Sequence, residues 1–243
     1  MNRSTLLGSG FIAIGLIVGG WLLGSQIKDV RLADRYVTVR GLAQQTVNAD
    51  LAIWPLSFRE AGNDLEATYA KSMKDDRAVL QFLTAQKIPA GDITQGQPGV
   101  TDTQATGYGG NRSPYRYIVE QSVTVRTHDV EGVAAAVQKA SALIAKGVVL
   151  GGGPAYGPRN GVSYLYTQLN SIKPAMITTA THNARIAAQR FAADSGSRVG
   201  AIRQASQGLF TITSADAPPG VASRSSILKK VRVVTTMQYF LSH

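Results

Sequence analysis

The chain has 243 residues, a formal net charge of +10 at pH 7, a sequence pI of about 10.0 and no cysteine. The lack of cysteine excludes a disulfide framework, a thiolate nucleophile and a cysteine-ligated metal site. Positive residues are spread along the chain without a dense run, and no zinc-finger spacing, helix-turn-helix or aromatic RNA-binding motif is present, which argues against a nucleic-acid partner. A basic surface beside anionic lipid and an ordinary solvated basic surface both remain open.

An apolar segment stands near the N-terminus. The nineteen residues from Leu6 to Gly24 carry no charge, and as a helix they reach about 28 Å, close to the hydrocarbon thickness of a bilayer. A secretory signal has a shorter apolar core and small residues at positions −3 and −1 before its cleavage site. Cleavage after Gly24 or Ser25 would place Leu22 or Leu23 at −3. We therefore expect the segment to be kept as a transmembrane helix, with cleavage as the alternative.

The expected domain organisation follows from this segment. Residues 1–27 are predicted to be a membrane anchor or uncleaved signal, and residues 28–243 an exported domain. The early position of the span favours a single pass through the cytoplasmic membrane, with the N-terminus in the cytoplasm and the C-terminal domain in a bacterial periplasm. Glycines four residues apart allow helices in a membrane to approach closely. The predicted packing residues are Gly15, Gly19, Gly20 and Gly24.

The first elements after the anchor are predicted to be strands. Residues 35–41 and 49–60 alternate apolar and polar side chains, with Ala52, Trp54, Leu56 and Phe58 on one side, which indicates a strand pair or one long bent strand. Pro55 has no amide donor and so marks an edge or a bulge.

A helix is predicted from about Asp64 to Gln86, capped by Asn63 or Asp64. Pro89 and Gly91 would end it, and a strand would follow near residue 93. Its apolar stripe is expected to contain Tyr69, Met73, Leu80 and Leu83.

Residues 95–114 are rich in Gly, Thr, Gln and Pro and offer few side chains that a core could bury. A loop of this length in a compact domain is functional or disordered. We predict a long hairpin loop whose end interleaves aromatic and cationic residues, the types that are enriched in interfaces. The residues expected to contact a neighbouring subunit are Tyr108, Arg112 and Tyr115, with ordinary loop chemistry as the alternative.

The second half of the chain repeats this order of elements. Residues 116–127 form the clearest predicted strand, and residues 128–147 a helix ended by Gly147. The apolar stripe of that helix is expected to be Val130, Val133, Val137, Ala140 and Ile144.

A short strand within 162–169 and the longest helix are predicted next. Pro174 would open this helix and Gly196 would close it. Strands near 199–210 and 227–241 complete the chain. The buried stripe of the long helix is expected to be Ile177, Ala180, Ala184, Ala187 and Phe191. Helix, glycine and strand recur after residues 86 and 195, which favours an α+β fold of mixed strands and packed helices, with duplication left open.

The chain resembles the SIMPL-domain family. The residues that carry the likeness are the opening strand "VTVRGLAQQTVNADLAIWPLSF", the stretch "YIVEQSVTVRTHDVEGVAAAVQKA" and the Ala-rich helix with its following strand, "KPAMITTATHNARIAAQRFAADSGSRVGAIRQASQG". The resemblance covers residues 35–241 and implies the fold better than an activity. It also implies export or membrane tethering, ring-like or cage-like homo-oligomers and a loose link to stress defence, and it carries over no catalytic residues.

A direct search for chemistry predicts no catalytic, cofactor or metal site. His128 precedes Asp129 at a helix start, where such a pair caps the helix, and His182 lies within the long helix, where it is expected to be solvated or at an interface. Asp75 and Asp76 diverge by about 100 degrees on a helix, so we expect a solvated face. The glycine-rich segment 151–161 lacks the Lys and Ser or Thr of a phosphate loop and is interpreted as a structural turn.

Two function classes remain. The first is a membrane-anchored, non-enzymatic assembly protein that forms a closed homo-oligomer, without cofactors and with the lipid bilayer and its own copies as partners. The second is a periplasmic hydrolase or small-ligand-binding receptor whose site is scattered through the sequence. A pocket that joined Glu120 or Glu131 to His128 would favour the second class. The absence of a catalytic motif favours the first.

Overall fold

The computed structural model describes residues 35–105, 114–151, 161–216 and 224–242. These residues confirm the predicted α+β fold. The structure adds that the strands form two antiparallel sheets. The chain divides into two compact units. Unit 1 comprises Met1–Gln44, Lys173–Phe210 and Arg232–His243, and unit 2 comprises Gln45–Ile172 and Thr211–Val231.

The predicted transmembrane helix, with Gly15, Gly19, Gly20 and Gly24, lies outside the described residues. Within the part of the chain that is described, no helix combines the length and the apolar character that crossing a membrane requires. The span therefore stays a prediction from the sequence.

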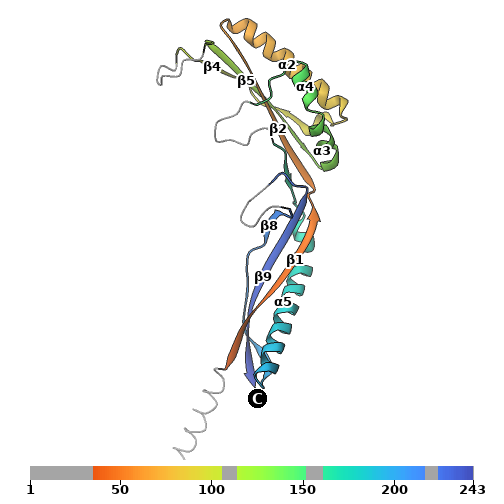
Figure 1. Cartoon of the computed structure of the whole chain (residues 1–243), viewed down its shortest axis with the longest axis vertical. Helices are drawn as coiled ribbons and strands as arrows, with labels where there is room; N and C mark the ends of the chain where they lie inside the picture. The colour runs from red at the N-terminus through yellow and green to blue at the C-terminus, as the bar shows by residue number, and fades with distance from the viewer. Residues whose placement is uncertain (1–34, 106–113, 152–160, 217–223, 243) are drawn as a thin grey trace, which may run out of the picture. The chain divides into compact units, whose positions relative to one another are not determined.

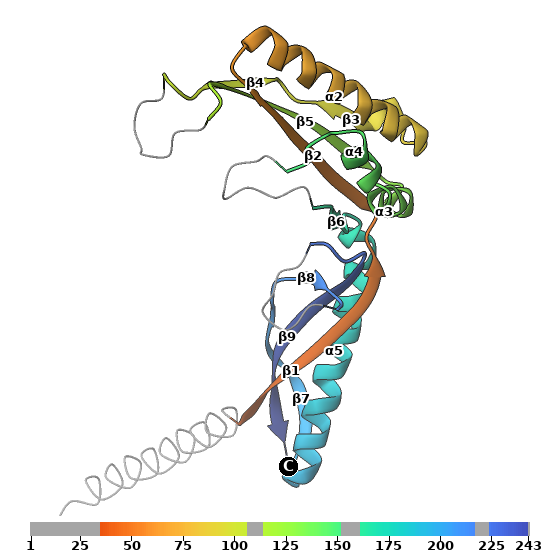
Figure 2. The same cartoon turned by 45° about the horizontal axis from the view of Figure 1, so that its top comes forward.

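The first sheet has the strand order β1-β9-β7, and β8 also pairs with β9 (Figures 1 and 2). Its strands are β1 Tyr36–Asn48, β7 Arg198–Gln207, β8 Thr211–Ser214 and β9 Leu228–Ser242. The strand predicted near 227–241 is β9, and its alternate residues are buried in phase, namely Val231, Val233, Thr235, Met237 and Tyr239. Helix α5, Leu169–Asp194, runs alongside β1 and β9 in both views (Figures 1 and 2).

Small residues allow α5 to approach the sheet closely. A Cβ at Gly41 of β1 would overlap the carbonyl oxygen of Ala180 and lie 2.8 Å from the Cβ of Ala184. The side-chain amide of Asn183 donates to the carbonyl of Leu42 at 2.9 Å, which ties the helix to the same strand. The backbones of strand and helix are thus in direct contact, and only glycine fits at position 41.

The buried face of α5 differs from the predicted stripe. It repeats every four residues as Met176, Ala180, Ala184, Ala188 and Ala192. The prediction that Phe191 is buried is wrong, because its side chain is 54% exposed. The predicted helix start is also wrong, since α5 begins at Leu169 and Pro174 lies inside it. Gly196, with a φ of +67°, follows the helix end as predicted.

The second sheet has the order β3-β5-β2-β6, with β4 also on β5 (Figure 2). Its strands are β2 Leu51–Gly62, β3 Ile93–Gln95, β4 Gly99–Asp102, β5 Tyr117–Thr127 and β6 Ser163–Leu165. The alternation predicted for β2 and β5 is confirmed, and its buried residues include Trp54, Leu56, Phe58, Val123 and Val125. Because β1 and β2 belong to different sheets, the alternative of a strand pair is wrong. Strand β6 pairs with β2 only at residues 51–53, so among the described residues β2 has a neighbouring strand at Pro55 on one side alone, namely β5. Pro55 therefore lies at an edge, as predicted.

Helix α2, Leu65–Ala85, packs on this sheet and is capped by Asp64, whose carboxylate accepts from the amide of Ala67 at 2.8 Å. Its buried face is rotated from the predicted stripe and is partly polar: Thr68, Ser72, Asp75, Asp76, Val79, Phe82 and Leu83. Tyr69 is 42% exposed. The prediction was right for Leu83 and wrong for Tyr69, because it counted apolar side chains alone. After the helix, Lys87 takes a φ of +63°, a conformation that glycine usually supplies, and the short 3₁₀ helix η1, Ala90–Asp92, comes next.

The single helix predicted over 128–147 is two helices, α3 Val130–Gln138 and α4 Ser141–Ala145. Between them, the amides of Ala142 and Leu143 donate to carbonyls three residues earlier. A 3₁₀ turn has three residues per turn, so it rotates the buried face of α4 relative to that of α3. Leu143 is consequently buried, and Ile144, which was predicted to be buried, is 63% exposed.

Candidate functional site

Strand β7 forms an edge of the first sheet. Among the described residues it pairs with β9 alone, and eight of its ten side chains are exposed. Ile202 is 51% exposed, and Leu209, just beyond the strand, is 91% exposed. An open strand edge with apolar side chains is a template for pairing with another chain.

The direction of the backbone groups identifies the open positions of β7. The amide of Gly208 donates to the carbonyl of Val234 on β9 at 2.8 Å. Backbone groups of an antiparallel strand point alternately to its two sides, so Ser206 also faces β9. The N–H and C=O groups of Ala205 and Gln207 therefore point away from β9.

The two halves of β7 differ in regularity. Register shifts occur between Val199 and Ile202 and between Ile202 and Gln204, whereas Gln204 to Gln207 pair with β9 in an unbroken register. Bulges twist an edge away from a partner strand. The regular half, Gln204–Gln207, is therefore the better edge for assembly.

The predicted hairpin contains one more strand than expected. Residues 99–102 form β4, which pairs with β5, and the last backbone contact joins the amide of Thr103 to the carbonyl of Arg116 at 2.8 Å. Arg116 Nη2 lies 3.1 Å from Asp102 Oδ2, and this interaction lowers the pKa of Asp102. The guanidinium of Arg116 also lies over the ring of Tyr117, at 4.9 Å from its centroid. The base of the hairpin is thus tied to the sheet.

Of the three predicted contact residues, only Tyr115 is described. Its side chain is 48% exposed at the base of the hairpin, and its carbonyl accepts from the hydroxyl of Thr103 at 2.9 Å. Tyr108 and Arg112 lie outside the described residues. Their contact with another subunit stays a prediction.

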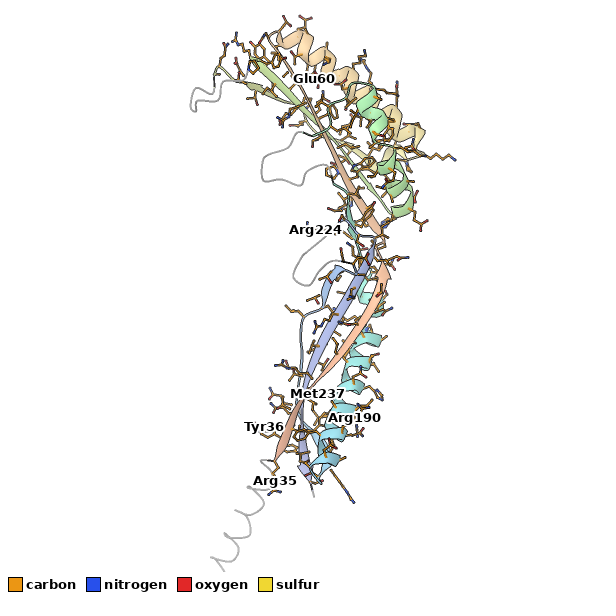
Figure 3. The ribbon with its side chains drawn as sticks, in the orientation of Figure 1. Arg35, Tyr36, Glu60, Arg190, Arg224 and Met237 are labelled. Carbon is orange, nitrogen blue, oxygen red and sulfur yellow. The ribbon has the colours of Figure 1, made fainter. Side chains whose placement is uncertain are left out.

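A buried acidic cluster lies between α2 and β2, and the sequence analysis missed it. Glu60 of β2, labelled in Figure 3, is 5% exposed. It forms an ion pair with Lys71 of α2, whose Nζ lies 2.7 Å from Glu60 Oε2. Asp75, one helical turn after Lys71, is 6% exposed. Burial, together with the hydrogen bond and charge of Glu60, raises the pKa of Asp75 to about 6.

A shared proton would pair the two unpartnered carboxyl oxygens of this cluster. Glu60 Oε1 and Asp75 Oδ2 are buried and have no hydrogen-bond partner among the described residues. One proton between the two carboxyl groups would satisfy both atoms. The cluster can therefore take up or release a proton in mildly acidic solution, and Lys71 compensates the remaining charge.

The prediction that Asp75 and Asp76 form a solvated face is wrong. Asp76 is 8% exposed, burial raises its pKa, and Gln95 Nε2 lies 3.4 Å from its Oδ2. Both aspartates occupy the helix positions that come after Thr68 and Ser72 on the buried face. The sequence would have predicted this buried face only if polar residues three and four positions apart had been counted together with the apolar ones.

Neither of the two described histidines, His128 and His182, forms a hydrogen bond or ion pair with a carboxylate. Asp129 caps α3, with Oδ1 accepting from Gly132 at 2.9 Å, and His128 Nδ1 lies 2.6 Å from the carbonyl oxygen of Asp50. His182 is exposed on α5. Glu120, at the opposite end of β5 from His128, pairs with Arg59 at 3.4 Å.

No group of three or more His, Cys, Asp or Glu side chains in the described ranges is placed to hold a metal ion. The predicted turn in the glycine-rich segment falls mostly on residues 152–160, outside the described residues.

Comparison with known families gives a match over most of the chain. The model of the SIMPL family, described as a protein of unknown function (DUF541), matches residues 37–238. A search of curated proteins finds no match.

Proposed function

From the premise that the chain belongs to the SIMPL family, we propose that it is a membrane-anchored, non-enzymatic assembly protein. Residues 1–27 hold it in the cytoplasmic membrane, and its C-terminal domain forms a ring-like or cage-like homo-oligomer on the periplasmic face. The observation that carries the proposal is the open edge of β7, because its regular half leaves Ala205 and Gln207 without a strand on that side among the described residues.

The apolar segment supports the membrane part of the proposal. Its nineteen uncharged residues are long enough to span a bilayer, and no small residue occupies position −3 of the two cleavage sites considered. Copies that are anchored in the same direction meet side by side. A head-to-tail contact between them must close into a ring if it is not to grow into a filament.

The first experiment measures the mass of the detergent-solubilised full chain by light scattering. We expect a closed oligomer of defined mass. The Ala205→Pro variant removes the outward amide but leaves the Ser206 and Gly208 contacts with β9, so it should yield a smaller particle with an unchanged circular dichroism spectrum. The Ala205→Val variant is the control, because it keeps the amide and should keep the full mass. A monomeric wild-type particle would overturn the assembly proposal.

The hairpin contribution is tested by a separate variant. Replacing residues 104–115 with Asn-Gly would join Thr103 to Arg116 by a two-residue turn and keep β4 and the Asp102–Arg116 pair. If Tyr108, Arg112 and Tyr115 contact a neighbour, the particle becomes smaller. An unchanged mass would remove the hairpin from the interface without affecting the role of β7.

The proposal extends to stress defence, which rests on the family resemblance alone. Comparing survival of the parent strain, a deletion strain and one carrying Ala205→Pro under oxidative and envelope stress tests it. Loss of survival in both altered strains would link assembly to defence, and equal survival would remove that role.

A further inference from the structure

The net positive charge of the protein is concentrated in unit 1. Among its described residues, Lys and Arg outnumber Asp and Glu by eight to one, whereas unit 2 has twelve of each. The single acidic residue of the described part of unit 1 is Asp194. A surface with this imbalance attracts anions, and unit 2 has no comparable excess in its described part.

Four arginines gather at one end of the first sheet, which we call the arginine end: Arg35, Arg190, Arg198 and Arg203. The amide of Leu241 donates to the carbonyl of Arg35 at 2.8 Å, and Arg198 is in register with Ser242, so both lie where β9 ends. Arg190 is one turn before the end of α5, which turns directly into β7 (Figure 3 labels Arg35 and Arg190).

Two exposed aromatic side chains accompany these charges. The guanidinium of Arg203 lies over the ring of Tyr36, 4.0 Å from its centroid, and Tyr36 is 44% exposed. Phe191, next to Arg190 on α5, is 54% exposed. Arginine beside exposed aromatic rings is the composition that favours the boundary between lipid headgroups and acyl chains.

Chain length limits how far this end can lie from the proposed anchor. Ten residues, 25–34, separate the apolar segment from Arg35. They span at most about 35 Å when fully extended. If residues 1–27 are anchored, the arginine end is therefore the part of unit 1 that the chain holds close to the bilayer.

We propose that the arginine end binds the anionic phospholipid surface of the membrane in which the chain is anchored. The arginines contact lipid phosphates, and Phe191 and Tyr36 contact the interfacial region. This inference rests on the proposed anchoring, but not on assembly through β7. The bulged half of that strand, which carries Arg198 and Arg203, faces lipid, and the regular half remains for another copy.

The test uses the full chain in vesicles of phosphatidylcholine alone or with phosphatidylglycerol. The chain has no cysteine, so Ala193→Cys on α5, an exposed position, gives one labelling site. Energy transfer from this label to a headgroup acceptor reports contact. We expect higher transfer in anionic vesicles and loss of the difference in high salt. Each substitution of Arg190, Arg198 or Arg203 by Gln should lower the contact equilibrium about fivefold, since one basic group near such a surface contributes about 1 kcal/mol.

A matched control neutralises exposed cations of unit 2, by Lys74→Gln, Arg77→Gln and Lys146→Gln, and should leave transfer unchanged. Equal transfer in both vesicle types, or an equal loss in this control, would overturn the inference. A flotation assay, which measures whether the chain rises with the vesicles in a density gradient, tests anchoring separately from contact of the arginine end with lipid. A chain that floats with neutral vesicles in high salt is anchored whatever the label reports. If it does not float with neutral vesicles, anchoring fails, and flotation with anionic vesicles that depends on the three arginines still decides the lipid proposal.

Discussion

Unit 1 and unit 2 each place a long helix on an antiparallel sheet, but they achieve stability differently. In unit 1, alanines and Gly41 bring α5 into backbone contact with β1, and the surface carries all the excess positive charge of the described residues. In unit 2, large side chains such as Trp54, Phe58 and Leu143 fill the core, and α2 also buries an acidic cluster. The same pair of elements can therefore be held by close approach or by side-chain volume, and each solution is sensitive to a different substitution.

The largest effect is expected from Gly41→Val, which places a side chain where β1 and α5 of unit 1 are in backbone contact. The added side chain would overlap the backbone of α5 at Ala180, so we expect a loss of about 3 kcal/mol or more in the free energy of unfolding. Hydrogen exchange should increase in β1 and α5. Gly91→Ala is the control, since nothing lies within 4 Å of a Cβ there, and it should leave stability unchanged. A stable Gly41→Val protein would show that close approach is dispensable.

The next effect concerns side-chain volume in unit 2. Leu143→Ala should cost about 3 kcal/mol in urea unfolding, because Leu143 is fully buried. Ile144→Ala, at the neighbouring position, should change stability by less than about 0.5 kcal/mol, because Ile144 is 63% exposed. Equal losses of stability for the two variants would contradict the break between α3 and α4 and would support the single continuous helix predicted from periodicity.

The acidic cluster makes the stability of unit 2 depend on pH. Because the pKa of Asp75 is about 6 in the folded protein and lower when unfolded, the folded state holds its proton more tightly. Its contribution is therefore fully present below about pH 4 and is lost as pH rises through about 6. Asp75→Asn should remove this dependence and stabilise the protein at pH 7.5 by roughly 1 kcal/mol.

Chemical denaturation at pH 5 and pH 7.5 measures this effect. Glu66→Gln, at an exposed position of α2, is the control and should keep the wild-type pH dependence. If Asp75→Asn and wild type respond to pH alike, the proton shared with Glu60 is not a feature of the protein.

The smallest effect is a gain. Lys87 adopts a φ of +63° after α2, whereas the equivalent position after α5 is Gly196 at +67°. Lys87→Gly should raise the free energy of unfolding by up to about 1 kcal/mol, since glycine takes this conformation without strain. Thermal unfolding measures it, with Lys74→Gly in the helix interior as a control that should destabilise. A destabilised Lys87→Gly protein would mean that backbone entropy outweighs the strain.

Periodicity predicted the strands well because alternation in β2, β5 and β9 depends on local geometry that a core then enforces. The helix cap was narrowed to Asn63 or Asp64 for the same reason, since the hydrogen bond that Asp64 accepts spans three residues. The break between α3 and α4 and the helical Pro174 escaped prediction because packing decided them over propensity. The acidic cluster was missed because Glu60 and Asp75 are fifteen residues apart and meet only when α2 folds onto β2. The edge of β7 was equally inaccessible, because an edge is a property of strand order.

The central place of β9 has a consequence for the order of synthesis and export. β9 is the last described strand, yet it lies between β1, the first, and β7. If the domain is exported as we propose, the first sheet cannot close until β9 has left the ribosome and crossed the membrane. Until then β1 has no partner strand among the described residues on either of its edges, and a strand from a neighbouring nascent chain could pair with it. Under the proposed export and assembly, copies would have to finish this sheet before they meet, which would make the timing of translocation part of correct assembly.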